Sequence, residues 1–188
     1  MSSDRDDYLR SVTVGELIPH DAPVHLAEYD PSWPSQFQYL ASRISRALGA
    51  NAILLEHVGS TSVPGLAAKP IIDMVLAVPN SNDETAYVPS LESEGFTVHI
   101  REPEWFAHRL LKSGEVESNL HVFSADCGEI GRMLAFRDWL RAHDDDRRRY
   151  EHAKRELAAR TWKHVQHYAD AKTSIVKEIL GRATAPSS

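Results

Sequence analysis

One apolar run constrains the fold of this chain more than any other feature. Residues 71–78 have the sequence IIDMVLAV, in which Asp73 is the only polar residue. An almost continuous apolar run of this length is typical of a strand that is buried on both faces inside a sheet. A second short apolar run, AILLEHV, covers residues 52–58. We therefore expect two strands, joined by the small-residue loop GSTSVPGLAAKP.

Helical and extended patterns alternate along the rest of the chain. Apolar residues at helical spacing between Ser32 and Leu48 predict a helix with Gly49 as its C-cap. A further helix is expected over 83–94, and strands are expected over 96–100, 105–112 and 119–124, with a hairpin turn at Ser113-Gly114. Three helices over 130–143, 146–160 and 164–181 complete the pattern. This order predicts an α+β fold, a small mixed β-sheet flanked by helices, with a C-terminal helical bundle.

The length fits one ordinary domain. The chain has 188 residues, and single domains commonly have ~100–200. We expect a loose N-terminal arm over 1–24, a single domain over 25–182 that becomes helical from about residue 128, and a tail over 183–188.

The composition excludes several classes of protein. The formal net charge is −6, which argues against a generally basic nucleic-acid surface. No apolar run approaches the ~20 residues of a membrane span. The first ten residues, MSSDRDDYLR, do not resemble a signal peptide, and Cys127 is the only cysteine. These features predict a cytoplasmic protein without disulfides.

The loop and the strand that follows it carry a pattern suited to phosphate binding. Gly59 allows the backbone to approach a ligand closely, and Lys69 supplies a positive charge. Hydroxyl and N–H donors follow the glycine at Ser60, Thr61 and Ser62. Asp73, inside an apolar strand, requires a partner such as a metal ion or a lysine. The alternative is a turn-rich connection in which Asp73 pairs with Lys69 or caps a neighbouring loop.

The stretch HVGSTSVPGLAAKPIIDMVLAV closely resembles the signature of the GrpB family. Other stretches match as well: EYDPSWPSQFQYLASRI upstream, and NLHVF, AFRDWLRAH and YEHAKRELAAR downstream. The resemblance covers about residues 24–182, and a similar domain is appended to some bacterial dephospho-CoA kinases. The family is assigned to the nucleotidyltransferase superfamily. The resemblance therefore implies a nucleotidyltransferase-like sheet flanked by helices, with a nucleoside triphosphate and Mg²⁺ as ligands.

The resemblance also implies roles for individual residues. Gly59 and Ser60 match the residues that hold the terminal phosphates, and Asp73 matches the first metal-binding carboxylate. The next expected carboxylate falls at Val75, so the usual two-metal site is incomplete. The region of a third carboxylate contains His121, which has three interpretations: a metal ligand, a general base, or a residue with a structural hydrogen bond.

Cationic residues elsewhere are further candidates for contacts to an anion. His108 and Arg109 are adjacent on an expected strand, so only one of them faces the site, and we prefer Arg109. In the C-terminal helices the candidates are Arg137, Lys154 and Lys172. The alternative is that the basic residues of these helices lie on solvated faces.

Three functions are consistent with these patterns. The first is binding of a nucleoside triphosphate with Mg²⁺ and transfer of a nucleotidyl group to a small acceptor, with Asp73 and His121 as catalytic residues. The second is a non-catalytic module that binds a nucleotide or another anion, which Val75 favours. The third is a different group-transfer or ligation chemistry with His121 as base. The expected partner is a small molecule or nucleotide, not nucleic acid or a membrane, and no oligomeric state is predicted.

Overall fold

Five strands form one mixed sheet at the centre of the computed structural model, which describes residues 2–184. The strand order is β2-β3-β6-β5-β4. The bounds of these strands are Leu54–Val58 for β2, Ile72–Val78 for β3, Thr97–Glu102 for β4, His108–Ser113 for β5 and Ser118–Ser124 for β6. Only β3 and β6 are parallel, and the other neighbouring pairs are antiparallel. The apolar run over 71–78 therefore forms an interior strand, as its composition predicts.

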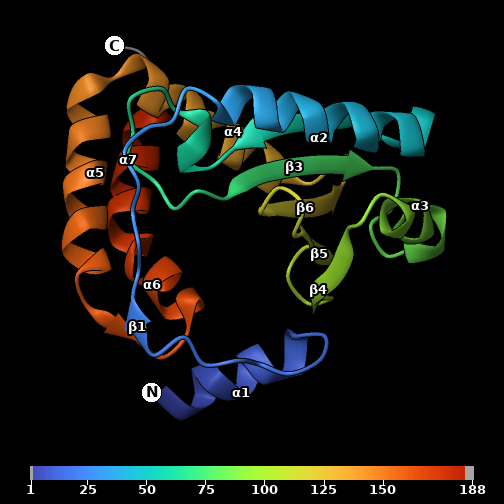
Figure 1. The fold of residues 1–188 in the computed structure, drawn as a ribbon, viewed down its shortest axis with the longest axis horizontal. Helices are drawn as coiled ribbons and strands as arrows, with labels where there is room; N and C mark the ends of the chain where they lie inside the picture. The colour runs from blue at the N-terminus through green and yellow to red at the C-terminus, as the bar shows by residue number, and fades with distance from the viewer. Residues whose placement is uncertain (1, 185–188) are drawn as a thin grey trace.

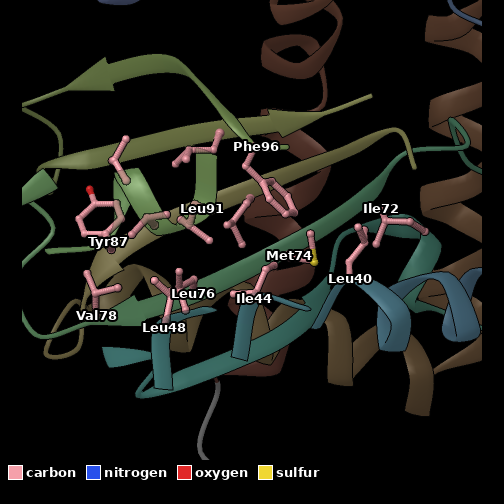
Figure 2. Packing of buried hydrophobic residues seen from close by; sticks show 14 of the residues in the cluster. Leu40, Ile44, Leu48, Ile72, Met74, Leu76, Val78, Tyr87, Leu91 and Phe96 are labelled. Carbon is pink, nitrogen blue, oxygen red and sulfur yellow. The ribbon is translucent and has the colours of Figure 1, made fainter. Parts of the chain in front are cut away.

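Two helices cover one face of this sheet. They are α2 (Trp33–Leu48) and α3 (Val88–Ser93). The apolar stripe of α2, including Leu40 and Ile44, packs on Met74 and Leu76 of β3, as Figure 2 shows. Gly49 ends α2 at a φ of 53°, which confirms it as the C-cap. This layer is the main hydrophobic core, and it directs alternate residues of β3 toward the opposite face.

The opposite face is covered only in part by α4 (Gly128–Ala142). Ile130 of α4 packs in one cluster with Val58, Val75, Ala77 and Phe123. The remaining helices are α5 (Asp144–Ala158), α6 (Val165–Ala171) and α7 (Thr173–Ala183). They stand together at the end of the sheet where β3 begins (Figure 1). The first residues of β3 therefore lie opposite the C-terminal helices on this face of the sheet.

The N-terminal segment differs from the expected loose arm over 1–24. Residues Ser2–Val12 form the helix α1, and Ala22–Pro23 form a short strand β1 paired with β7 (Thr161–Trp162). Leu9 and Val12 are buried. The amide of Val14 donates to the carbonyl of His99 on β4. These contacts are to residues far along the chain, so no local periodicity in the sequence indicates them.

Three other elements differ from the expected ones. The helix expected over 83–94 is divided into a 3₁₀ turn η3 (Glu84–Ala86) and α3, and the strand expected from residue 105 begins at His108. The helix expected over 164–181 is interrupted at Lys172, which lies between α6 and α7. Two more 3₁₀ turns, η1 (Gly49–Asn51) and η2 (Ser60–Ser62), flank β2. Most of the expected tail, residues 185–188, lies outside the described residues.

The sequence-based fold class is confirmed: a mixed α+β arrangement in which a small sheet is flanked by helices and followed by a helical C-terminal part. Among the described residues, no helix combines the length and the apolar character that crossing a membrane requires.

Candidate functional site

The site is built around a close contact between Gly59 and Asp73. Gly59 follows β2 directly, with a φ of 67° that places it in the left-handed region. A Cβ atom added to Gly59 would lie 2.5 Å from Oδ2 and 2.9 Å from Cβ of Asp73. The loop therefore reaches the carboxylate only because residue 59 has no side chain.

Asp73 lies on the sheet face that α2 and α3 leave uncovered. Pairing in the sheet places it beside Val58 on β2 and Asn119 on β6. Asn119 Nδ2 donates to Asp73 Oδ1 at 2.8 Å. Val75, two residues further along the same face, is 0% exposed and packs under α4. The position expected to hold a second carboxylate is therefore part of an apolar contact.

A pocket opens between this carboxylate and the C-terminal helices. It contains about 330 Å³ of space, part of it open to solvent, and three lysines are among its lining residues. Lys69 comes from the loop before β3, Lys154 from α5, and Lys172 from the junction of α6 and α7. Ser60, Thr61 and Asp73 also line it. The structure thus brings together most of the predicted phosphate-binding residues.

The pocket lysines combine burial with the lack of an ion-paired carboxylate in the described structure, since Lys154 is buried and Lys69 and Lys172 are half-buried. Within residues 2–184, Lys163 is the lysine that forms an ion pair, and the three pocket lysines form none. Lys154 is 1% exposed, and its Nζ donates to the carbonyl of Ala67. Burial, followed by repulsion from Lys172, lowers the pKa of Lys154 to about 7. Burial also lowers the pKa values of Lys69 and Lys172. Such a concentration of poorly compensated cations favours an incoming anion.

Two tyrosines complete the wall formed by the helices. Tyr150 of α5 is buried, and its ring centroid lies 5.1 Å from Lys154 Nζ. Tyr168 of α6 is 1% exposed, and its hydroxyl has no hydrogen-bond partner in the described part of the chain. Its ring centroid lies 4.7 Å from Lys172 Nζ. Since Tyr168 lines the pocket, its hydroxyl remains available to a ligand.

The other hydroxyl residues of the loop have structural partners. The Thr61 hydroxyl donates to the carbonyl of Ile71 at 3.1 Å, and the Ser62 hydroxyl donates to the carbonyl of Gly59 at 2.6 Å. Thr61 Oγ1 also lies 3.0 Å from His57 Nε2. Because the hydroxyl hydrogen is directed at Ile71, His57 Nε2 carries a hydrogen and donates to Thr61. Burial lowers the pKa of His57 to about 4, so this ring is neutral.

The buried His57 predicts that the free energy of unfolding depends on pH in the acid range. Unfolded, His57 binds a proton near its ordinary pKa of 6.5, whereas in the folded protein it remains neutral down to about 4. The unfolded state therefore binds more protons in this window, and the free energy of unfolding should fall as the pH is lowered through it. In His57→Gln the slope should be smaller by up to about 1.4 kcal/mol per pH unit.

Urea denaturation at a series of pH values measures that slope. His152→Gln is the matched control, because the side chain of His152 on α5 is 76% exposed. Equal slopes in wild type and His57→Gln would contradict the assignment of His57 as a neutral buried ring.

Two predicted anion-binding arginines lie elsewhere. Arg109 points to the opposite face of the sheet, where its Nε donates to Glu84 Oε1 at 2.6 Å. Our choice of Arg109 over His108 is therefore wrong, because the register of β5 places the side chain of His108 on the face that carries the site. Arg137 of α4 is held by Glu56 Oε2 at 2.7 Å and by the carbonyl of His57 at 2.9 Å. Both guanidinium groups have carboxylate partners and do not line the lysine pocket.

His121 lies on the same face as Asp73. It is paired with Val75 in the parallel β3–β6 ladder, two positions along β6 from Asn119. Its Nδ1 lies 3.1 Å from Nε2 of His108. The two predicted catalytic residues therefore face the same open region of the sheet.

The donor set at Asp73 fits one magnesium ion accompanied by phosphates, but not a pair of metal ions held by the protein. Within residues 2–184, no group of three or more His, Cys, Asp or Glu side chains is arranged to hold a metal. Asp73 Oδ1 is engaged by Asn119, so Oδ2 is the oxygen that remains for a cation. Mg²⁺ in proteins is often held by one or two carboxylates together with substrate phosphates.

Sequence reasoning missed several residues of the site. Asn119 lies two positions from His121 and His108 lies next to Arg109, and strand alternation together with the correct register would have found them. Tyr150 and Tyr168 resemble ordinary core aromatics in their helices, so no local signal assigns them to the pocket. Lys112 of β5 pairs with Asn119 and adds a further cation to the site face.

Comparison with known proteins gives consistent matches. The family model described as GrpB protein matches residues 23–182. A UPF0157 protein from Halalkalibacterium halodurans is 59% identical over 180 residues, which are 96% of this chain and 92% of that protein. A dephospho-CoA kinase from Mycolicibacterium paratuberculosis is 29% identical over 188 aligned positions, which cover 86% of this chain and 46% of the kinase.

A solved structure also aligns over most of the fold. The crystal structure of the conserved protein GrpB from Enterococcus faecalis superimposes with a TM-score of 0.70 and 31% sequence identity. The alignment covers 85% of this chain and 96% of that chain. The two proteins therefore share the fold over most of this chain.

Proposed function

The chain belongs to the GrpB family, and from the geometry of its pocket we propose that it binds the phosphates of a nucleoside triphosphate and transfers the nucleotidyl group to a small acceptor. The observation that carries the proposal is the group of three pocket lysines without carboxylate partners, placed beside Asp73 and the Gly59-Ser60 loop. A triphosphate would supply the missing negative charge and would restore the protonated form of Lys154.

Each pocket residue has a defined role in this proposal. Lys69, Lys154 and Lys172 contact phosphate oxygens and stabilise the charge that develops on the departing pyrophosphate. The Ser60 and Tyr168 hydroxyls orient the phosphates by hydrogen bonding. Asp73 would hold one Mg²⁺ ion that arrives with the triphosphate, and such an ion neutralises phosphate oxygens.

The variant Asp73→Asn distinguishes the contribution of the pocket lysines to phosphate binding from the contribution of Mg²⁺. We expect Asp73→Asn to retain binding of ATP in the presence of EDTA, because the lysines remain and one negative charge is gone. The additional affinity that Mg²⁺ provides in the wild type should disappear. Pyrophosphate release should fall by about 100-fold or more, as expected for the loss of an electrostatic group at a reacting phosphate.

Calorimetric titration with ATP, CTP, GTP and UTP, with Mg²⁺ and with EDTA, measures the binding, and a coupled assay measures pyrophosphate. Asp126→Asn is the control, since Asp126 is an exposed carboxylate in the turn before α4. The proposal fails if the wild type binds none of the four triphosphates. An Asp73→Asn protein that behaves like the wild type would remove Asp73 from the site.

A binding module without turnover is the second candidate. The buried Val75 favours it, because the second carboxylate of a two-metal site has no place there. The match to less than half of a dephospho-CoA kinase is compatible with such a module, since there the similar segment accompanies a separate enzyme. Saturable ATP binding without pyrophosphate release would favour this candidate.

A further inference from the structure

A second line of polar side chains crosses the same face of the sheet beyond the lysine pocket. Tyr8 of α1 donates to Glu102 Oε1 on β4 at 2.5 Å. The other carboxylate oxygen of Glu102 lies 2.7 Å from His108 Nδ1 on β5. His108 Nε2 lies 3.1 Å from His121 Nδ1 on β6. The line therefore begins at the N-terminal helix and ends at His121.

The carboxylate sets the direction of these hydrogen bonds. Burial opposes ionisation of Glu102, but hydrogen bonds from His108 and Tyr8 hold its pKa below the usual value. Ionised Glu102 accepts the hydrogen on His108 Nδ1, so a neutral His108 presents an unprotonated Nε2. That nitrogen accepts the hydrogen on His121 Nδ1. His121 Nε2 then has no hydrogen, and it has no hydrogen-bond partner within the described residues.

The position of His121 makes this open nitrogen useful. The ring is half-buried on the face that carries Asp73 and Asn119. Burial lowers the pKa of His121 to about 4, so the ring is neutral near pH 7. A neutral imidazole that is oriented by a second group, on the sheet face that carries Asp73, matches the arrangement of a general base.

We propose that His121 is the general base of the reaction at this site, that His108 and Glu102 are positioning residues which hold its tautomer, and that the acceptor is a hydroxyl group. This inference rests on the proposed function. A phosphate or carboxylate acceptor is already an anion, and a neutral amine already has an available lone pair. An alcohol becomes a strong nucleophile only as its proton leaves, so it is the acceptor class that requires this line of residues.

The step balances without further reactants. The acceptor oxygen forms a bond to the α-phosphorus while its proton passes to His121 Nε2. The bond between the α-phosphorus and the bridging oxygen breaks, and pyrophosphate leaves with the electron pair. His121 then releases the proton to water, and the protein returns to its starting state.

The experiment compares His121→Asn and Glu102→Gln with the wild type, using ATP with Mg²⁺ and glycerol as the probe acceptor. Asparagine at 121 retains a donor for His108, and glutamine at 102 keeps the size of the side chain. We expect ATP affinity to change by less than about threefold in both variants, since neither residue lines the lysine pocket. The kcat for pyrophosphate release should fall by about 100-fold or more in His121→Asn. It should fall by about tenfold in Glu102→Gln.

Two further readouts distinguish catalysis from structural support. Imidazole added to His121→Ala should restore part of the kcat, which a purely structural loss would not allow. Nitrogen-15 NMR of the histidines should show His121 protonated on Nδ1 and bare on Nε2, and Glu102→Gln should weaken that preference. His99→Asn, a half-buried histidine on β4 outside this line, is the control.

The outcomes separate this inference from the proposed function. A wild type that does not bind ATP overturns the proposed function, and the inference with it. Binding without pyrophosphate release in the presence of glycerol overturns the base while leaving the binding site intact. Turnover that is unchanged in His121→Asn, or a His121 ring with its hydrogen on Nε2, overturns the inference alone.

Discussion

Replacement of Gly59 by alanine is expected to destabilise the protein strongly and to open the loop that carries Ser60. The φ of 67° at this position costs a residue with a side chain about 1–3 kcal/mol. The new Cβ would also lie 2.5 Å from Asp73 Oδ2 and 2.9 Å from Asp73 Cβ, which requires a shift of the strand or of the loop. Overpacking of this kind adds about 1–3 kcal/mol.

Gly65→Ala is the matched control for this experiment. Gly65 has a φ of 76°, but a Cβ added there meets nothing within 4 Å. Both variants place a side chain at a positive φ, so chemical denaturation of the two isolates the additional cost of the overlap with Asp73. The double variant Gly59→Ala/Asp73→Gly should recover most of the difference. Equal destabilisation in the two alanine variants would show that the loop does not approach Asp73 closely.

Replacement of Lys154 by methionine is expected to give the largest loss of anion binding. A hydrogen bond to a charged group contributes about 1.5–3 kcal/mol, so pyrophosphate should bind about 10- to 100-fold more weakly. The free energy of unfolding should change much less, because methionine has a similar volume and removes a buried cation that has no carboxylate partner. The wild-type affinity should also decline above pH 7, where Lys154 loses its proton.

Lys177→Met controls for the change in net charge. Lys177 is exposed on α7, and its replacement alters the total charge by the same amount. Calorimetry with inorganic pyrophosphate measures both affinities, and urea denaturation measures both stabilities. Equal affinities in the two variants would exclude Lys154 from the anion site.

Local sequence patterns were sufficient for the interior strand and for the position of the Gly59 loop between β2 and β3. The run over 71–78 has only one polar residue, so its burial and the exceptional position of Asp73 both follow from the sequence. The loop glycine was also identified, because close backbone approach requires the residue without a side chain. Lys154 and Lys172 came from the family resemblance rather than from local spacing. Their presence in the pocket depends on how three helices pack at the end of the sheet.

The errors have a common physical origin in long-range contacts. Alternation shows that His108 and Arg109 face opposite sides, but the side is decided by pairing with β6 and β4. The register with β4 also shifts between Val98 and Ile100. Helix α1 is held mainly by residues that are distant along the chain, such as Glu102 and Asp170. Neither the pairing of β5 with its neighbours nor the contacts of α1 produce a periodic pattern in the sequence of these segments.

The order of the pocket residues along the chain has a consequence for the time at which the site forms. Gly59, Ser60 and Asp73 belong to the first half of the chain, whereas Lys154, Tyr168 and Lys172 belong to its last fifth. Closing such a long loop is entropically costly and slow. During synthesis, the sheet can assemble around Asp73 before the helical wall has emerged. The proposed phosphate site is therefore complete only in the finished chain, and a ligand that contacts both halves of it would stabilise the last contacts to form.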